Sequence, residues 1–166
     1  MTTPSEEYRE ILLTQGQVAI VDVEDFEWLS QWEWQAKWNS HTKSFYAVRG
    51  RSKGVKWIGM HKLILAPPDG MIADHISHST LDNRRQNLRS STHSQNAMNR
   101  KKRNNISGYK GVCWYGARGK WGVIFGTRQT RRFLGLFADK VEAAKAYDEA
   151  AKAEFGEFAH LNFPPT

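Results

Sequence analysis

One segment near the middle of the chain constrains the fold more than any other. Ala66-Pro-Pro-Asp-Gly70 is a strong turn signal, and residues 71–76 and 87–91 have the composition of two short strands separated by a polar loop. Thr92 and Gln95 then form a capping-box pattern, in which two residues satisfy each other's backbone donors at the start of a helix. The segment therefore predicts a strand, a loop, a second strand and a helix in succession.

Asp74 and His75 lie side by side at the end of the first predicted strand. Hydrolysis of a phosphodiester needs an activated water and stabilisation of the charge on the phosphate. A hard divalent ion held by oxygen ligands stabilises that charge, and a histidine accepts a proton near neutral pH. Because neighbours in a regular strand point to opposite faces, both residues serve one site only if the strand ends there, which the loop from Ser77 predicts. Asn96 offers another oxygen ligand, and Asn87 is placed to orient His75.

The run Ala73-Asp-His-Ile-Ser-His-Ser-Thr-Leu-Asp-Asn-Arg-Arg-Gln-Asn-Leu-Arg89, followed by Ser94-Gln-Asn96, resembles the HNH motif of phage and intron homing endonucleases. The resemblance implies a ββα-metal unit. It further implies that Asp74 and Asn96 bind a single divalent ion, Mg²⁺ or Mn²⁺, that His75 is the general base and that Asn87 braces the active-site loop. Many members of that family have histidine at the helical position, so His93, one turn earlier, is an alternative ligand. His61 and His78 are interpreted as structural or DNA-proximal.

Basic residues are concentrated in the second half of the chain. The net charge is +7, and residues 109–137 contain basic residues but no acidic ones. A polyanion is the natural partner of such a surface, and we expect it to be double-stranded DNA. The predicted DNA contacts are Arg84, Arg85, Arg89, the linker residues Arg100, Lys101, Lys102 and Arg103, and Lys110, Arg118, Lys120, Arg128, Arg131, Arg132 and Phe133 in the last segment.

The last segment predicts three short strands, over residues 109–115, 121–125 and 131–137, and then a helix. Asp139 and Glu142 form a second capping box, and the helix extends to about Phe155 with an alanine stripe along one face. The stripe consists of Ala143, Ala146, Ala150 and Ala153.

The last segment also resembles a known DNA-binding family. Gly108-Tyr-Lys-Gly-Val112, Phe133-Leu-Gly-Leu-Phe137, Glu142-Ala-Ala-Lys-Ala-Tyr-Asp-Glu-Ala-Ala151 and Leu161-Asn-Phe-Pro164 are similar to the ethylene-response-factor (APETALA-type) DNA-binding domain. The resemblance implies a three-stranded antiparallel sheet in the major groove with a helix behind it. Cys113, Ile124 and Gly126 stand where plant members have arginine or glutamate, so the plant base preference does not carry over.

The first segment predicts a strand-rich unit. Residues 17–23, 34–38, 44–49 and 55–60 are expected to be strands, and residues 25–32 one or two helical turns. Five of the seven tryptophans fall here, a density that indicates a small aromatic core, with stacking on bases as the alternative interpretation. They are Trp28, Trp32, Trp34, Trp38 and Trp57.

Taken together, these patterns predict an α+β protein in four parts. The parts are a strand-rich DNA-positioning unit (1–60), a ββα-metal nuclease (61–98), a basic linker (99–107) and a sheet packed on one helix (108–166). We expect a site-directed DNA endonuclease, acting as a monomer and as a nickase. The alternative hypothesis is a DNA-binding regulator that has lost cleavage. The single cysteine, Cys113, excludes an internal disulfide and fits a reducing cytoplasm, in a phage-infected or bacterial host cell. No apolar run is long enough to predict a membrane span or membrane partner, and no protein partner is evident.

Overall fold

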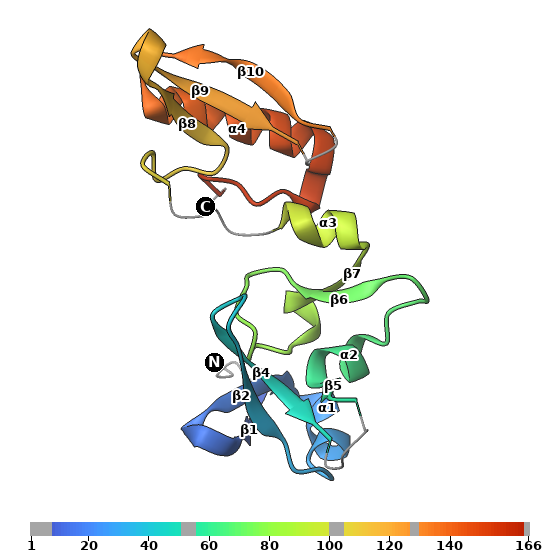
Figure 1. Ribbon diagram of the computed structural model, residues 1–166. Helices are drawn as coiled ribbons and strands as arrows, with labels where there is room; N and C mark the ends of the chain where they lie inside the picture. Colours follow the sequence, from blue (N-terminus) through green and yellow to red (C-terminus); the bar gives the residue numbers. More distant parts are fainter. Residues whose placement is uncertain (1–7, 51–55, 100–104, 127–129, 165–166) are drawn as a thin grey trace, which may run out of the picture. The chain divides into compact units, whose positions relative to one another are not determined.

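The computed structural model describes residues 8–50, 56–99, 105–126 and 130–164, which form a mixed α+β structure as predicted (Figure 1). The chain divides into two compact units, residues 1–93 and 94–166, and each is described by itself. The division falls after His93, the first residue of the helix of the central segment. Among the described residues, no helix is long and apolar enough to cross a membrane.

Unit 1 is built from three small antiparallel pieces and two short helices. The first two strands pair with each other, the next three form a sheet in the order β3-β4-β5, and β6 pairs with β7. The bounds are β1 (Tyr8–Leu12), β2 (Val18–Asp22), α1 (Val23–Leu29), β3 (Gln35–Asn39), β4 (Ser44–Arg49), β5 (Ile58–Gly59), α2 (Met60–Leu65), β6 (Ile72–His75) and β7 (Leu88–Ser91).

One hydrophobic core holds unit 1 together. Leu29 of α1, Trp34 and Met60 are buried in it, and so is Leu88 of β7. The strand-rich first segment and the β6–β7 hairpin therefore share a core. The loop between β6 and β7 is also tied to β2, because the backbone of Ile20 exchanges hydrogen bonds with Leu81 and Asn83.

The tryptophans of unit 1 fall into two classes. Trp34 is buried, its ring nitrogen donates to the carbonyl of Leu29 at 2.9 Å, and Trp32 contacts its ring edge-on, as the core interpretation predicts. For Trp38 and Trp57 that interpretation was wrong, since their side chains are 52% and 45% exposed.

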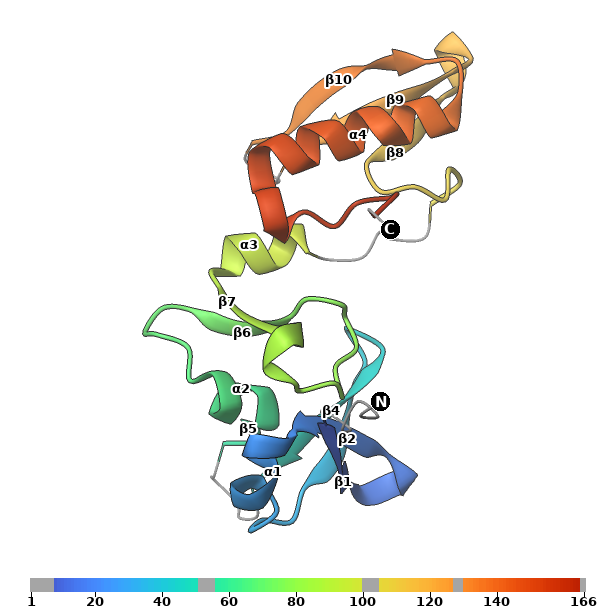
Figure 2. The ribbon, with the colours of Figure 1, turned by 180° about the vertical axis from the view of Figure 1, so that it is seen from behind.

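Unit 2 contains a three-stranded antiparallel sheet in the order β10-β9-β8, with one long helix lying across one of its faces (Figure 2). Val112, Val123 and Phe125 point from the sheet toward the helix and form the core with its buried side chains. The bounds are α3 (His93–Met98, at the boundary between the units), β8 (Val112–Tyr115), β9 (Lys120–Phe125), β10 (Arg132–Phe137) and α4 (Lys140–Phe155).

Helix α4 begins as its sequence predicts. The Asp139 side chain accepts hydrogen bonds from the backbone nitrogens of Val141 and Glu142, at 2.7 and 3.0 Å, and these bonds hold the pKa of Asp139 below its ordinary value. The predicted alanine stripe needs correction. Ala143 is buried, but Ala153 is exposed, and the buried face is completed instead by Ala144, Tyr147, Asp148 and Ala151.

The Tyr147 ring fixes how closely α4 approaches the sheet. A Cβ atom on Gly111 would lie 2.1 Å from this ring, so only glycine fits there, and the backbone of Gly111 also has a positive φ of +77°. Burial raises the pKa of Tyr147 to about 12.

Candidate active site

His75 is the last residue of β6 and is buried beneath two other aromatic side chains. Its ring centroid lies 4.9 Å from that of His61 on α2 and 6.0 Å from that of Tyr46 on β4. The β6–β7 pairing places His75 opposite Leu88, and the backbone nitrogen of Ile76 still donates to the carbonyl of Asn87. Strand β6 ends at His75, but its pairing with β7 is regular at both Asp74 and His75, so the two side chains point to opposite faces. Their shared use in one site stays a prediction.

A hydrogen bond to Asn83 sets the tautomer of His75. Nε2 of His75 lies 3.3 Å from Oδ1 of Asn83, and Nδ2 of Asn83 donates to the carbonyl of Leu81. An amide oxygen can only accept, so the imidazole carries its proton on Nε2 when this bond forms. The other ring nitrogen, Nδ1, is then the atom able to take a proton.

Burial keeps both histidines of this cluster neutral at pH 7. Burial lowers the pKa of His75, although the hydrogen bond to Asn83 opposes the shift. Burial, and then repulsion from His75, lower the pKa of His61 to about 3. Nδ1 of His61 is buried and has no hydrogen-bond partner within the described part of the chain. A neutral imidazole is the form that a general base needs.

Asp74 points to the other side of β6 and forms a buried ion pair. Its Oδ2 accepts from Nε and Nη2 of Arg89, both at 3.2 Å, and Arg89 is its direct partner across the hairpin. Both side chains are about 9% exposed. The guanidinium therefore supplies a counter-charge to a carboxylate that would otherwise be costly to bury.

Asn87 holds the loop between β6 and β7 in shape. Its Oδ1 accepts from the backbone nitrogen of Ser77, and its Nδ2 donates to the carbonyls of Ser79 and Asp82, at 3.0, 3.2 and 2.7 Å. The loop is anchored from outside as well, because the Thr80 hydroxyl donates to the carbonyl of Phe45 at 2.5 Å. The side chain of Asn87 thus connects three points of one loop.

The remaining predicted arginines of unit 1 have partners within the fold. Arg84 pairs with Asp82 at 2.7 Å and holds the pKa of that carboxyl below its ordinary value. Arg85 binds the buried carboxylate of Asp25 at 2.8 Å. Together with the buried Arg89, these residues have structural roles, and their contacts to DNA stay predictions. The linker residues Arg100, Lys101, Lys102 and Arg103 lie outside the described residues, as does Arg128.

The sheet of unit 2 exposes an aromatic and basic face on the side away from α4. Tyr115 and Phe133 lie over Gly122, with ring centroids 5.7 Å apart, because a Cβ atom on Gly122 would collide with the Tyr115 ring. Tyr115 and Phe133 line a shallow pocket that Arg131 and Arg132 also border. Arg132 in addition forms an ion pair with Glu154. Arg118 and Lys120 are exposed at the turn between β8 and β9.

Lys110 differs from the other predicted basic contacts because it is partly buried. Its Nζ donates to the carbonyl of Met98 at 2.6 Å, and burial lowers its pKa to about 8. It therefore joins the last turn of α3, the helix that carries Asn96 and His93, to the sheet of unit 2. Asn96 is half-buried on this helix and His93 is exposed.

The donor chemistry of Asp74 and Asn96 fits a hard divalent ion. Carboxylate and amide oxygens suit Mg²⁺ or Mn²⁺, which keep several waters and bind substrate phosphates rather than an all-protein cage. The described residues contain no group of three or more His, Cys, Asp or Glu side chains able to hold a metal ion. The two residues belong to different units, so their pairing stays a prediction.

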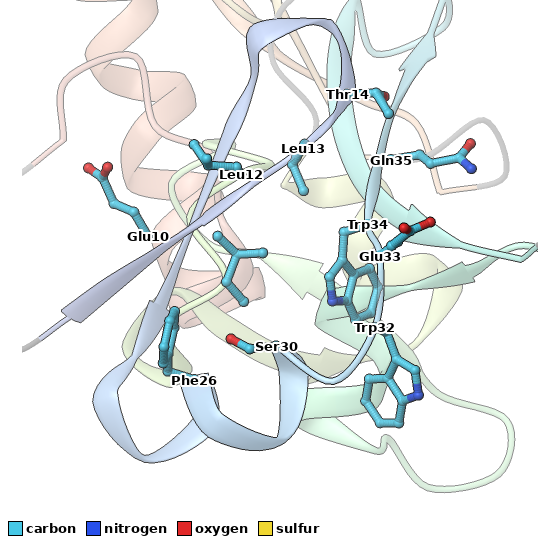
Figure 3. Close-up of a pocket in the computed structure, with 11 residues that line it drawn as sticks. Glu10, Leu12, Leu13, Thr14, Phe26, Ser30, Trp32, Glu33, Trp34 and Gln35 are labelled. Atoms are coloured by element: carbon cyan, nitrogen blue, oxygen red, sulfur yellow. The ribbon is translucent and has the colours of Figure 1, made fainter.

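Another cavity of unit 1 lies away from His75. It has a volume of about 640 Å³ and is lined by residues of β1, α1 and β3 (Figure 3). Its ionisable lining residues are Glu10 and Glu33, with no basic side chain. Such a lining repels a polyanion, so this cavity is not part of a DNA site.

Comparison with known protein families identifies the domain that contains His75 and the hairpin of β6 and β7. The pattern of the HNH endonuclease family matches residues 66–98, which contain β6, its loop, β7 and α3. This segment is an HNH endonuclease domain. No solved structure shows significant similarity to the chain.

Part of the chain is also similar to plant DNA-binding proteins of the AP2/ERF type. Dehydration-responsive element-binding protein 2A of Arabidopsis thaliana is 52% identical over 48 residues, which cover 28% of this chain and 14% of that protein. Dehydration-responsive element-binding protein 2C of the same plant is 44% identical over 68 residues, covering 37% and 18%. An AP2/ERF and B3 domain-containing protein of Oryza sativa subsp. japonica is 45% identical over 58 residues, covering 35% and 16%. The chain spans less than two fifths of the length of these relatives.

The sequence did not place three neighbours of His75 at the site. Asn83 and Tyr46 received no role, and His61 was interpreted as structural or DNA-proximal. Asn83 belongs to the loop quoted above, and its position three residues after Thr80 gave no sign that it contacts His75. His61 and Tyr46 come from α2 and β4, outside residues 66–98, and only the shared core brings them to the site. Only the burial of Asn83, a polar residue in a polar loop, indicates that it has a role at the site.

Proposed function

We propose that this chain is a metal-dependent DNA endonuclease of the homing type, with His75 as its general base. The observation that carries the proposal is the buried, neutral imidazole at the end of β6, held by Asn83 inside an HNH domain. Asp74 and Asn96 would hold a single Mg²⁺ or Mn²⁺ ion, which would supply stabilisation of the charge on the phosphate and on the departing 3′-oxygen.

The protein's own groups divide the remaining work. Nδ1 of His75 takes the proton from the attacking water. Nε2 keeps its own proton and donates it in the hydrogen bond to Oδ1 of Asn83. The imidazole is then cationic, and the carboxylates of Asp74 and Asp82 favour this form, since both raise the pKa of His75. Asn87 keeps the loop in one conformation so that these groups stay aligned.

The sheet of unit 2 is proposed to bind duplex DNA. Its exposed face joins aromatic side chains to basic ones, and similarity to AP2/ERF proteins supports the same use. Contacts from Arg131, Phe133, Arg118 and Lys120 would give affinity and register, and the basic linker would lie along phosphates. We propose a monomer that nicks one strand, because one HNH domain offers one reaction centre.

A regulator that binds DNA without cutting it is the second candidate. The observation that favours it is the naming of the similar plant proteins for binding a DNA element. Such a protein has no need of a neutral imidazole at the end of β6, which is why we place the endonuclease first.

The test is incubation of the purified chain with supercoiled plasmid that carries the DNA flanking its own gene. Reactions with Mg²⁺, with Mn²⁺ and with EDTA are run for the wild type, for His75→Ala and for His41→Ala, a control at an exposed turn. We expect open circles with either metal from the wild type and the control, and none from His75→Ala. DNA that is shifted in a gel yet left intact with both metals would establish the regulator instead.

A further inference from the structure

A second hollow in unit 1 lies beside the His75 cluster. It is a groove of about 340 Å³ bordered by β3, β4 and the start of α2. We call it the Trp38 groove, and its lining includes Lys37, Trp38, Tyr46, Trp57, His61 and Lys62.

Two large aromatic side chains of this groove are exposed. Trp38 leans edge-on against Phe45, with ring centroids 5.0 Å apart, and Trp57 lies under the ammonium group of Lys37 at 4.8 Å. Trp34, in contrast, is buried in the core of the same unit. Tryptophan side chains left at a surface next to lysines are typical of sites that stack on bases or pack on sugars.

The charge of the groove favours an anion. Its ionisable lining residues are Lys37, Lys62, His61 and Tyr46, and none is acidic. The whole lining comes from residues 37–62, which contain no Asp or Glu, so the basic character of the groove extends over this segment of the chain. The large cavity of Figure 3 has the opposite character, with Glu10 and Glu33 and no basic side chain.

The groove also adjoins the candidate general base. His61 and Tyr46 both line it, and both rings contact His75, at centroid distances of 4.9 and 6.0 Å. A strand lying in the groove would therefore contact two of the side chains that cover His75.

We propose that the Trp38 groove binds the DNA strand that is cut, on one side of the phosphodiester that is broken. Lys37 and Lys62 neutralise its phosphates, and a base of that strand stacks on Trp38 or Trp57. The assignment of this strand as the one that is cut rests on the proposed function, whereas binding in the groove is measurable without cleavage.

The test uses the full chain in EDTA with duplex DNA from the flanks of its own gene, substituted with 5-iododeoxyuridine. Affinity is measured for Trp38→Ala, Trp57→Ala and Lys37→Gln. The matched controls are Leu12→Ala, an exposed apolar residue of the acidic cavity, and Arg9→Gln, an exposed cation of β1. Thermal melts confirm that every variant is folded.

We expect at least one of the two tryptophan variants to weaken binding roughly fivefold to a hundredfold, as the loss of one stacked base does. The controls should stay within about twofold, and irradiation should crosslink the DNA to Trp38 or Trp57. Three results would each overturn DNA binding in the groove. They are wild-type affinity in the folded groove variants, equal losses of affinity in the controls, and crosslinks that avoid both tryptophans. If the wild type crosslinks there but never cuts with Mg²⁺ or Mn²⁺, the groove stands and the endonuclease proposal alone fails.

Discussion

Two buried histidines at the centre of unit 1 link its stability to pH. The pKa of His61 falls from an ordinary value of 6.5 to about 3 in the folded chain, because burial penalises the charged form. In the unfolded chain His61 therefore binds a proton near pH 6.5, whereas in the folded chain it binds one only near pH 3. The free energy of unfolding is therefore highest above pH 6.5, and it decreases progressively as the pH falls toward 3.

We predict that the free energy of unfolding falls by up to about 1.4 kcal/mol per pH unit below pH 6.5 through His61 alone. The His61→Gln variant should show a shallower decline, measured by urea unfolding at pH 7, 6 and 5. His41→Gln, at an exposed turn, should keep the wild-type slope. An unchanged slope in His61→Gln would show that His61 is not held neutral by the fold.

The side chain of Asn87 is predicted to be needed for stability as well as for alignment. Asn87→Asp removes both donors to the carbonyls of Ser79 and Asp82 and adds a buried charge. We expect a loss of about 3 kcal/mol in the free energy of unfolding. Asn39→Asp is the control, because Asn39 uses only its oxygen, as an acceptor from His41 and Thr42, in an exposed turn. Equal effects of the two substitutions would contradict the bracing role of Asn87.

At the scale of secondary structure, one side chain next to the sheet of unit 2 hydrogen-bonds to helix α3. Lys110 donates to the carbonyl of Met98, at the last residue of α3. Replacing it with methionine keeps the length and removes the donor, so we expect backbone amides of α3 to exchange about tenfold faster with solvent. Hydrogen exchange is the measurement, and Lys145→Met on the exposed face of α4 is the control. Unchanged protection of α3 would show that Lys110 does not hold it.

The accuracy with which the sequence predicted each helix and strand depended on how distinct its local sequence pattern is. Strand β4 spans the expected residues, and the hairpin of β6 and β7 and helix α4 lie within a residue or two of expectation. Helix α2 was not predicted, and only its first residue, Met60, fell within an expected strand, because the short apolar run from Met60 has no periodicity that distinguishes helix from strand. Strand β1 was not predicted, since Ile11 is its only buried residue and an alternating pattern is absent.

The candidate site was predictable only where its residues are neighbours in sequence. The Asp-His pair and the loop asparagines fall within one recognisable run. His61 and Tyr46 reach His75 through packing of α2 and β4, and no local pattern reports such a contact. The burial of Arg89 against Asp74 was missed for the same reason, since an arginine in a short strand usually has a solvated side chain.

For the whole molecule, the charge distribution predicts a strong dependence of DNA binding on salt. The dissociation constant should rise with salt concentration in a linear log–log relation. Replacing Arg100, Lys101, Lys102 and Arg103 together by glutamine should reduce that slope by about three to four, if all four neutralise phosphates. Titrations at several salt concentrations measure it, and glutamine at Lys140, Lys145 and Lys152 on the exposed face of α4 is the control. A slope that the linker variant leaves unchanged would exclude phosphate contacts from the linker.

The central claim is that this chain hydrolyses DNA with His75 as the general base, and chemical rescue tests it most directly. His75→Gly leaves a buried space of imidazole size at the end of β6. With Mg²⁺ and plasmid carrying the flanks of the gene, single-turnover cleavage by this variant should fall roughly a hundredfold to ten-thousandfold. Added imidazole should restore part of the rate to His75→Gly and none to Asp74→Ala. Cleavage by His75→Gly at the wild-type rate, or no cleavage by the wild type with either metal, would contradict the account.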